Sequence, residues 1–524
     1  MTREPTGAGS SGAARAPDAS LSLPEDVMRA LGRQVVDMVA DHMTGGGSPG
    51  IEGDAAAEVA RLRSERVPTA AAADPAAVLE ELRRLLSLGN AHPDHPGFLA
   101  FVPSPGTFAG VLGAALATGF AVPTGWRFTG AVSSAIEAAT IDWLVDLLGL
   151  SPGTSGLFLS GGSTANLTAL TAARDARVGT EARGATAYFS DQTHFSVPRA
   201  LHVLGIGEDR VRALASGDDQ RLAVSTVAAA LATDRRAGLR PFLVVANAGT
   251  TGTAAVDPLP ELAELCRSEG LWLHVDGAYG GPAALTVRGR RALAGLDLAD
   301  SVTVDPHKWL FQPAETGCVL LREPRHLRHA FGVPLPSYLE GADDGREAPA
   351  GDDGGVDFLQ WGLQQTREFR ALRLWLSLKV FGADAFRAAI DRGLDAATRA
   401  ARHVEATPGL EMVTGPRLAV LTFKGLPAPG EPPPPPHLAD QAVDEVCRTL
   451  RREGRAVVVG ATVTGRRVFR LCTINPRIET DDLREVVRRI GELWRLRTRG
   501  MRAGEPAGPA PGPDEVRDVP EVLS

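Results

Sequence analysis

Several features that mark membrane, secreted or nucleic-acid-binding proteins are absent from this sequence. No run of about 18 apolar residues occurs among its 524 residues, and residues 1–20 lack the apolar core of a secretory signal. The formal net charge is −8, which argues against nucleic acid or an anionic membrane as a partner. We therefore expect a soluble cytoplasmic protein that binds neither nucleic acid nor membranes.

Cysteine is also scarce, with four residues at Cys266, Cys318, Cys447 and Cys472. They form no CxxC pair, and no histidine cluster has the spacing of metal ligands. Reduced thiols in the cytoplasm are the simplest interpretation, and we predict no metal site.

Composition changes along the chain predict several parts, because the chain is too long for one compact core. Glycine, alanine, proline and charge dominate residues 1–20 and 500–524, which predicts disordered tails. Residues 21–90 form an N-terminal helical segment that opens with an amphipathic helix after Pro24. That helix needs a partner surface, for which a second subunit is a candidate. Its apolar positions are Val27, Leu31, Val35 and Met38.

The rest of the chain predicts an α/β protein with two domains. Between residues 91 and 385, short apolar runs alternate with helical stretches, which indicates a large domain with a mostly parallel sheet. Residues 386–499 alternate on a smaller scale and predict a small C-terminal α/β domain. In such sheets ligands bind beyond the carboxyl ends of the strands. The polar residues at the predicted strand ends are Ser160, Ser190, Asn247, Asp276 and Asp305.

Four segments near these ends carry chemically useful side chains. FLSGGSTANLTAL places Gly162 and Ser163 at a helix start, as in a phosphate cradle. SDQTHF puts His194 just past a strand, and HVDGAYGG ends a strand with Asp276. DPHKWL holds Lys308 among apolar neighbours, with no other lysine nearby. Taken singly, each has an ordinary structural explanation, such as a tight turn, a satisfied histidine, an N-cap or a lysine with a buried stem.

One cofactor, pyridoxal 5′-phosphate, needs all four features together. Its aldehyde forms a Schiff base with a lysine amine, and its pyridine nitrogen needs a carboxylate to stay protonated. Its phosphate suits a helix N-terminus, and an imidazole face can hold the ring in plane. The combination therefore predicts an enzyme that uses this cofactor.

These motifs resemble those of the group II pyridoxal phosphate-dependent decarboxylases, the family of aromatic amino acid, histidine and glutamate decarboxylases. The resemblance covers about residues 24–497 and includes HPDHPGFLAFVPS, SGGSTANL, SDQTHFSV, HVDGAYGG, DPHKWL and VFRLCTINP. It implies fold-type I, which is aspartate aminotransferase-like, and a homodimer with active sites at the interface. The implied reaction is decarboxylation of an aromatic or apolar L-amino acid to the amine, through a Lys308 Schiff base and a quinonoid.

The resemblance also implies a role for each residue that would contact the cofactor ring. Lys308 would carry the cofactor, and Asp276 would pair with the pyridine nitrogen. Ala278 would pack against the ring, while His194 would stack on its other face. Asn247 stands where relatives often carry threonine, near the 3′-oxygen of the cofactor.

Further residues would hold the phosphate and the substrate. Gly162 and Ser163 would bind the phosphate, with a contribution from His307. Arg470 matches an arginine that binds the substrate carboxylate in some relatives, and a surface ion pair is the alternative. The aromatic residues Phe98, Phe101 and Trp126 match segments that line the substrate side, and core packing is the alternative for each.

For the proton donor to the substrate α-carbon, the sequence leaves two possibilities. In aromatic amino acid decarboxylases it is a loop tyrosine, and Phe358 takes the matching position in GVDFLQWGLQQTREFRALRLW. Of the three tyrosines, Tyr188, Tyr279 and Tyr338, only Tyr338 is near this segment. We expect Tyr338 to be the acid and the amine to be the product. If Phe358 replaces the acid, oxygen would intercept the reaction and the product would be an aldehyde.

Overall fold

The computed structural model describes residues 21–45, 55–66, 74–102, 104–334 and 356–499. The predictions for the two tails and for Tyr338 therefore lie outside the described residues. The chain divides into two compact units, Met1–Gly46 with Gly53–Gly89, and Gly47–Glu52 with Asn90–Ser524. Within the described ranges, no helix is both long and apolar enough to cross a membrane.

The described part of the first unit consists of α1 (Glu25–Thr44), α2 (Ala56–Ser64) and α3 (Pro75–Ser87). The helix expected after Pro24 is present as α1, and it contacts α3. None of the residues in these helices is buried, so the apolar side chains of their amphipathic faces remain available to a partner. The exposed apolar side chains include Met28, Val35, Val59, Val78 and Leu86.

The second unit contains a seven-stranded sheet. Its strands are β1 (Ser155–Leu159), β2 (Ala185–Ser190), β3 (Val211–Leu214), β4 (Arg240–Asn247), β5 (Trp272–Asp276), β6 (Ser301–Val304) and β7 (Gly317–Leu321). Their order is β1-β7-β6-β5-β4-β2-β3, and every pairing is parallel except those of β7 with β1 and β6. Strands β2, β5, β6 and β7 are buried throughout, which explains their continuous apolar runs. The predicted mostly parallel sheet is confirmed.

The carboxyl ends of β1, β2, β4, β5 and β6 lie at one edge of this sheet. These strands point the same way, because β7 is antiparallel to both β1 and β6. Asn247 and Asp276 end neighbouring strands and are direct partners in the register. Asp305 follows β6 by one residue. The polar strand ends expected from the sequence are thus gathered together.

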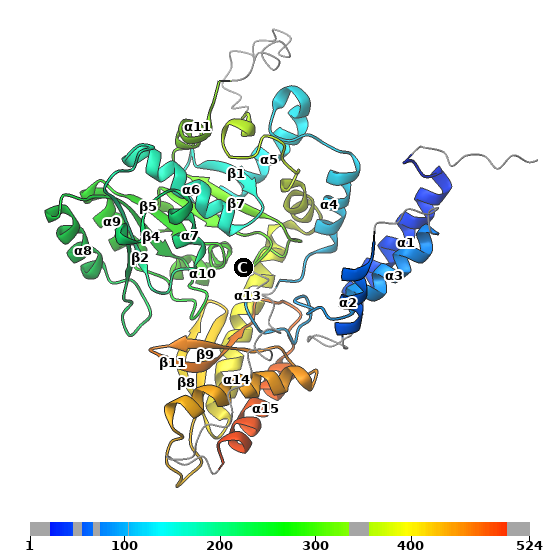
Figure 1. Ribbon diagram of the computed structural model, residues 1–524, viewed down its shortest axis with the longest axis vertical. Helices are drawn as coiled ribbons and strands as arrows, with labels where there is room; N and C mark the ends of the chain where they lie inside the picture. The colour runs from blue at the N-terminus through cyan, green and yellow to red at the C-terminus, as the bar shows by residue number, and fades with distance from the viewer. Residues whose placement is uncertain (1–20, 46–54, 67–73, 103, 335–355, 500–524) are drawn as a thin grey trace, which may run out of the picture. The chain divides into compact units, whose positions relative to one another are not determined.

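Helices pack around the large sheet, as Figure 1 shows. They are α4 (Phe108–Gly119), α5 (Arg127–Leu148), α6 (Gly162–Arg177), α7 (Ser196–Val203), α8 (Val224–Arg236), α9 (Leu259–Glu269), α10 (Val287–Ala292) and α11 (Arg325–Phe331). α6 contacts β1, β4, β5, β6 and β7, so its N-terminus, at the end of β1, lies at the polar edge. Short 3₁₀ turns follow β5 at Gly281–Leu285 and precede the last long helices at Phe358–Gln360.

A second, four-stranded sheet lies in the C-terminal part of this unit. It consists of β8 (Leu410–Arg417), β9 (Val420–Gly425), β10 (Val459–Val463) and β11 (Arg466–Cys472), in the antiparallel order β10-β11-β9-β8. The helices α13 (Ala371–Ala406), α14 (Pro436–Arg452) and α15 (Thr480–Thr498) complete it. α13 contacts α4 and α5 as well as β8 and α15, so it joins the two sheets. The domain limit expected at 385/386 falls within this helix, three residues after its non-helical Gly382.

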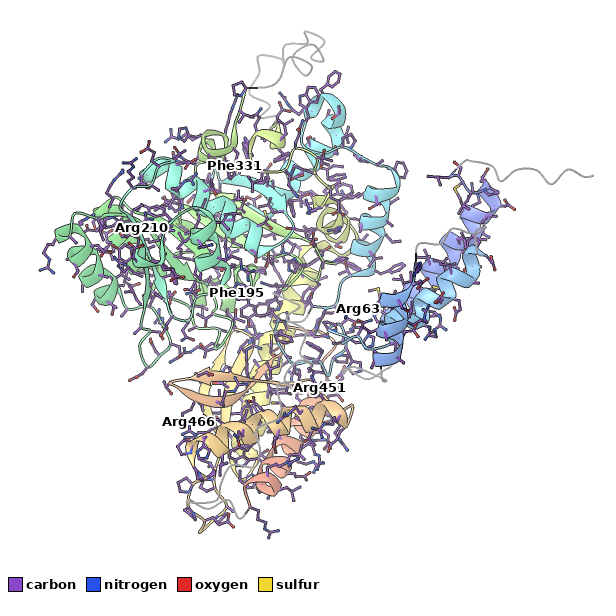
Figure 2. The ribbon with its side chains drawn as sticks, viewed as in Figure 1. Arg63, Phe195, Arg210, Phe331, Arg451 and Arg466 are labelled. Carbon is purple, nitrogen blue, oxygen red and sulfur yellow. The ribbon has the colours of Figure 1, made fainter. Side chains whose placement is uncertain are left out.

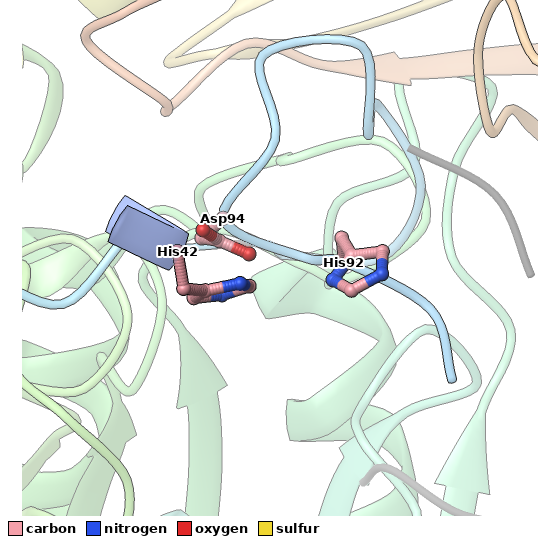
Figure 3. Close-up of side chains that lie close together, drawn as sticks. All are labelled: His42, His92 and Asp94. Atoms are coloured by element: carbon pink, nitrogen blue, oxygen red, sulfur yellow. The ribbon is translucent and has the colours of Figure 1, made fainter. Parts of the chain in front are cut away.

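The start of the second unit runs along the small sheet. His92 and Asp94, shown in Figure 3, lie on this segment, and the carbonyl of Asp94 accepts a hydrogen bond from Asn475 Nδ2 (3.0 Å). Further on, Leu99 N–H donates to the carbonyl of Val457 (2.8 Å). These bonds fix the path of the backbone that leads to Phe101.

Candidate active site

Lys308 lies in the turn that follows β6, next to a buried carboxylate. Its Nζ is 2.9 Å from Oδ2 of Asp305, whose side chain is 2% exposed. Burial lowers the pKa of Lys308, but the charge and hydrogen bond of Asp305, together with the charge of Asp276, outweigh it and leave the pKa above its usual value. The amine is therefore protonated at neutral pH, with a carboxylate in place to take the proton.

Asp305 had no role in the sequence analysis beyond its place at a strand end. Its Oδ1 is buried and has no hydrogen-bond partner among the described residues. An unsatisfied buried oxygen is costly, and such groups gather at functional sites. The signal in the sequence was its position three residues before Lys308 in a turn, which places both side chains on one side.

The glycine turn before α6 packs tightly against this group. A Cβ on Gly162 would lie 2.8 Å from Oδ2 of Asp305 and 3.2 Å from the Cβ of Ala278. A Cβ on Gly161 would lie 3.1 Å from the ring of His307. Only glycine permits this approach. The structure therefore brings together the expected residues of the phosphate cradle, the ring contact and the lysine turn.

The first turn of α6 is open to an anion. No side chain in the described chain caps this helix, whose N-cap is Gly161, and Ser163 is exposed in its first turn. Nδ1 of His307 accepts from the N–H of Thr316 (3.1 Å), and burial lowers the pKa of His307. His307 is thus neutral at neutral pH with its proton on Nε2, which lies 3.7 Å from Oδ2 of Asp305.

Asp276 and His194 belong to the same site. Oδ1 of Asp276 accepts from the N–H of Ala278 (3.1 Å), and Oδ2 accepts from Nδ2 of Asn166 (2.9 Å). Burial lowers the pKa of His194, while Asp276 opposes that shift and Lys308 adds to it. Its ring lies 4.2 Å from that of Phe195, which Figure 2 labels beside the large sheet. The sequence predicted both residues but not Asn166, which looks in the sequence like an ordinary helix position.

Asn247 is buried, and both of its amide hydrogens are used. Nδ2 donates to Oγ1 of Thr193 (3.0 Å) and to Oδ2 of Asp257 (2.9 Å). A bond donated by Nδ2 to the 3′-oxygen of a cofactor would have to replace one of these two, whereas Oδ1 could only accept. The role that the structure gives Asn247 is to hold the segment that carries His194.

Arg470 is buried, so the expected alternative of a surface ion pair is wrong. It is 3% exposed, and it donates from Nε to the carbonyl of Thr251 (2.9 Å) and from Nη1 to that of Phe101 (2.7 Å). Nη2 is buried and has no partner in the described part of the chain. The hydrogens of Nη2 are therefore unsatisfied in the described chain.

The three aromatic candidates differ in burial. Phe98 is 3% exposed and packs with Ala100 and Val457, so core packing accounts for it. Phe101 is 48% exposed and lies 6.2 Å from the Phe98 ring, so core packing does not account for it. Trp126 is half-buried and lies 4.9 Å from Phe128.

Phe358 is buried in a 3₁₀ turn, whereas the alternative in which it takes the place of the acid expects it on a loop. It is 1% exposed, its ring meets that of Trp361 edge-on at 5.9 Å, and the Arg367 guanidinium lies over it at 5.1 Å. Tyr188 donates to Asp234 (2.6 Å), and Tyr279 stacks on Trp309. Burial raises the pKa of both tyrosines, so neither is a ready proton donor.

The residues present fit pyridoxal 5′-phosphate. The site offers a lysine amine, an acidic partner for a ring nitrogen, a neutral histidine and an uncapped helix start. Glycine at position 162 lets the helix start lie close to Asp305 and Ala278, where a Cβ would collide with both. This set matches the aldehyde, the pyridine nitrogen, the ring face and the phosphate.

Comparison with known proteins agrees with this fit. The pyridoxal-dependent decarboxylase conserved domain matches residues 59–425. The chain is 40% identical over 481 residues to an aromatic-L-amino-acid decarboxylase of Bacillus atrophaeus. The aligned region covers 90% of this chain and 97% of that protein. It is 28% identical over 431 residues to a 4-hydroxyphenylacetaldehyde synthase of Rhodiola rosea, covering 80% and 84%.

A solved structure shows the same fold. The crystal structure of Oryza sativa TDC with PLP and tryptamine superposes with a TM-score of 0.83 at 26% identity, over 92% of this chain and 99% of that one. The expected fold-type I architecture is therefore confirmed, as is the expected cofactor. The protein is a carboxy-lyase that acts on an amino acid with pyridoxal 5′-phosphate. The chain belongs to the pyridoxal-dependent decarboxylase family, in its group II.

Proposed function

We propose that the protein converts an aromatic L-amino acid to its amine. The observation that carries this proposal is the Lys308–Asp305 pair at a sheet edge that also holds Asp276 and His194. The substrate class is supported by the relative with 40% identity, which is an aromatic-L-amino-acid decarboxylase. Phe101 supports it from within the chain, because its exposed aromatic side chain suits an aromatic substrate.

The side chains around Lys308 prepare the amine and the ring contacts. Pyridoxal 5′-phosphate, when bound, supplies an aldehyde for the lysine and a ring that takes up the electron pair left by carbon dioxide. Lys308 must lose a proton before it attacks a carbonyl, and Oδ2 of Asp305 is placed to accept it. Asp276 would hold a proton on the pyridine nitrogen, and neutral His194 would cover one ring face with Ala278 on the other.

The remaining contacts would hold the two anions. The first-turn amides of α6, at Gly162 and Ser163, would bind the phosphate, with His307 donating from Nε2. Arg470 would bind the substrate carboxylate through Nη2 until that group leaves. Since its other two contacts are carbonyls, the arginine brings an uncompensated positive charge to the substrate.

We assign the protonation of the α-carbon to Tyr338 and the product to the amine. Phe358 offers no support for the aldehyde route, because it is packed in the core. An aldehyde synthase is among the relatives, but at 28% identity against 40% for the decarboxylase. Amine formation therefore stands first.

Product analysis tests this proposal. The purified protein with its cofactor is incubated with L-tyrosine, L-tryptophan, L-phenylalanine and L-glutamate, under air and under nitrogen. We expect equal amounts of carbon dioxide and amine from an aromatic substrate in both atmospheres. A preference for glutamate would overturn the substrate class. Aldehyde, ammonia and peroxide as the main products under air would overturn the product.

A variant tests the assigned acid. Tyr338→Phe is expected to slow amine formation by about 10²–10⁴, the usual contribution of a general acid, and to raise the aldehyde yield under air. An unchanged rate with amine as the only product would move the acid role to another group. His194→Gln, measured beside it, separates the two candidates.

We further propose a cytoplasmic homodimer whose active sites lie at the subunit interface. The four cysteines are all free and buried, as in a reducing compartment. Apolar side chains are exposed on α1 to α3, and within the second unit on α4 and the start of α5. In the second unit these are Leu112, Leu116, Phe120, Phe128 and Val132. Deletion of residues 1–43 should weaken both association, measured by sedimentation, and activity; a fully active monomer would contradict the proposal.

A further inference from the structure

A buried asparagine in α6 connects the ring-nitrogen carboxylate to the rest of the core. Asn166 is 1% exposed, and Nδ2 donates both to Oδ2 of Asp276 (2.9 Å) and to Oγ of Ser196 (2.9 Å). Its Oδ1 is 3.0 Å from Nε2 of His274. Because a carboxylate only accepts, the amide nitrogen must face Asp276, and this decides the orientation of the whole group.

The hydrogen bonds from Trp272 through Ser301 and His274 to Asn166 all run in one donor-to-acceptor direction. Nε1 of Trp272 only donates, and it donates to Oγ of Ser301 (2.8 Å), which is 2.8 Å from Nδ1 of His274. Burial lowers the pKa of His274 to about 4, so this imidazole is neutral and carries one proton. Oδ1 of Asn166 requires that proton on Nε2, and the Ser301 hydroxyl therefore donates to Nδ1.

The hydrogen bonds from Asn166 through Ser196 to His194 continue in the same donor-to-acceptor direction. Oγ of Ser196 accepts from Asn166, so its own hydrogen is free to go to Nδ1 of His194, 2.8 Å away. The Ser196 backbone N–H points to the same nitrogen (3.3 Å). Burial lowers the pKa of His194, so its ring carries one proton at neutral pH. With two donors at Nδ1, that proton must be on Nε2.

We propose that Asn166 is a positioning residue that holds Asp276 and, through Ser196, fixes His194 as the tautomer protonated on Nε2. This inference rests on the proposed function, in which both residues act on the cofactor. Asn166 offers a hydrogen to Asp276, which fixes the orientation of that carboxylate, and it prevents His194 from accepting a hydrogen bond at Nε2. His194 can then only donate from that nitrogen, toward an acceptor such as the substrate carboxylate.

A purely structural role for Asn166 predicts a different result. If the bonds only stabilise the core, their loss lowers the free energy of unfolding but leaves the position of the His194 proton unchanged. The position of that proton is therefore the deciding measurement. Nitrogen-15 NMR reports it directly, since protonated and unprotonated imidazole nitrogens have well separated chemical shifts. The full-length protein as purified is labelled at histidine, and His194→Gln assigns the signal among the 11 histidines.

The expected spectrum shows Nε2 of His194 in the protonated range and Nδ1 in the unprotonated range. Asn166→Asp keeps the shape but replaces the donor by an acceptor, so the Ser196 hydroxyl turns toward it. Nδ1 of His194 then loses its stronger donor, and its signal should move toward the protonated range. Ser196→Ala should cause a smaller shift in the same direction, because it removes the hydroxyl donor without leaving an oxygen that could accept a hydrogen from Nδ1. The variant Ser196→Ala also provides the test if Asn166→Asp does not fold.

Trp272→Phe is the matched control. It removes a hydrogen bond from the same buried chain, yet Asp276 still orients Asn166, so the His194 signals should stay in place. A wild-type protein with the proton on Nδ1, or unchanged signals in both Asn166→Asp and Ser196→Ala, would overturn the inference. The proposed function fails separately: the Nε2 tautomer in a protein that forms no aromatic amine leaves the positioning role standing, and the reverse result removes only that role.

Discussion

Two buried ion pairs of the second unit differ in how completely their carboxylate oxygens are satisfied. Arg367 and Glu137 are 1% and 0% exposed at the side chain, and both oxygens of Glu137 accept from the guanidinium (2.5 and 3.1 Å). Arg367 also donates to the backbone carbonyl of Phe158, and Glu137 accepts from the backbone N–H of Phe158. Both carboxylate oxygens of this pair are thus satisfied, although Nε of Arg367 has no hydrogen-bond partner among the described residues.

The pair of Lys308 and Asp305 is left incomplete. Lys308 is 24% exposed at the side chain, and Oδ1 of Asp305 has no partner among the residues described. The first pair fastens α5 and β1 to the segment before α13, while the second holds a reactive amine ready. A buried carboxylate with an unsatisfied oxygen at a sheet edge thus indicates chemistry, and one with both oxygens satisfied indicates stability.

The largest effect is expected from Lys308→Ala. Activity should fall below detection, and the visible absorbance of the bound cofactor that borohydride removes should be absent, because the amine is its only covalent attachment. The free energy of unfolding should also fall, because Asp305 is left buried without its partner charge, so the absorbance is read on protein whose folding has been checked by circular dichroism. A variant that keeps the borohydride-sensitive band would remove Lys308 from its assigned place.

Glu137→Gln should have a different profile. It leaves Arg367 buried without a compensating charge, which typically costs about 3–5 kcal/mol. Denaturant unfolding should show that loss, while the folded fraction at low temperature keeps its borohydride-sensitive cofactor. An unchanged unfolding midpoint, or a loss of cofactor without a loss of stability, would show that the two pairs do not differ as described.

Asp305→Asn should give a smaller effect that depends on pH. The folded-state pKa of Lys308 is raised, so the pair contributes stability that is complete below the unfolded pKa of about 10.4 and is lost as the pH rises through the folded value. The amide keeps a hydrogen-bond acceptor but not the charge, so the variant should lose about 1–2 kcal/mol at neutral pH. The difference from the wild type should narrow above about pH 10.

Cofactor uptake by Asp305→Asn gives a second measurement. Removing the carboxylate lowers the pKa of Lys308, so more of the amine is neutral at a given pH. The rate at which apoprotein gains the visible band should therefore reach its plateau at a lower pH than in the wild type. A profile that moves to higher pH would contradict the assignment of Asp305 as the partner of the amine.

The sequence predicts the parts of the site that are local and misses those that are not. Strand ends and turns are short-range features, so Asp276, His194 and Lys308 could be found from neighbouring residues alone. Asn166 lies 110 positions from Asp276, and no periodicity records that the two side chains meet. The tautomer of His194 depends in turn on that contact, so only the fold reveals it.

Phe358 also shows that contacts between distant residues cannot be predicted from neighbouring residues. Its neighbours in the sequence suggest a loop position, because the segment follows a stretch rich in glycine and aspartate. Its burial depends on Arg367 and Glu137, which are 230 positions apart and come together only in the fold. The burial of this position could therefore not be predicted from the sequence, and its part in the reaction stays a prediction.

The smallest effect on chemistry is expected from Phe358→Tyr. If the ring occupied the place of the acid, the added hydroxyl would convert an aldehyde-forming enzyme to an amine-forming one. The ring instead lies between Trp361 and Arg367, away from solvent, where a new hydroxyl adds only a buried polar group that costs about 1–3 kcal/mol if unpaired. The amine-to-aldehyde ratio under air should equal that of the wild type, while the unfolding midpoint falls. Leu359→Ala beside it controls for disturbance of the same 3₁₀ turn. A changed product ratio in Phe358→Tyr alone would place the ring next to the substrate and restore the aldehyde route.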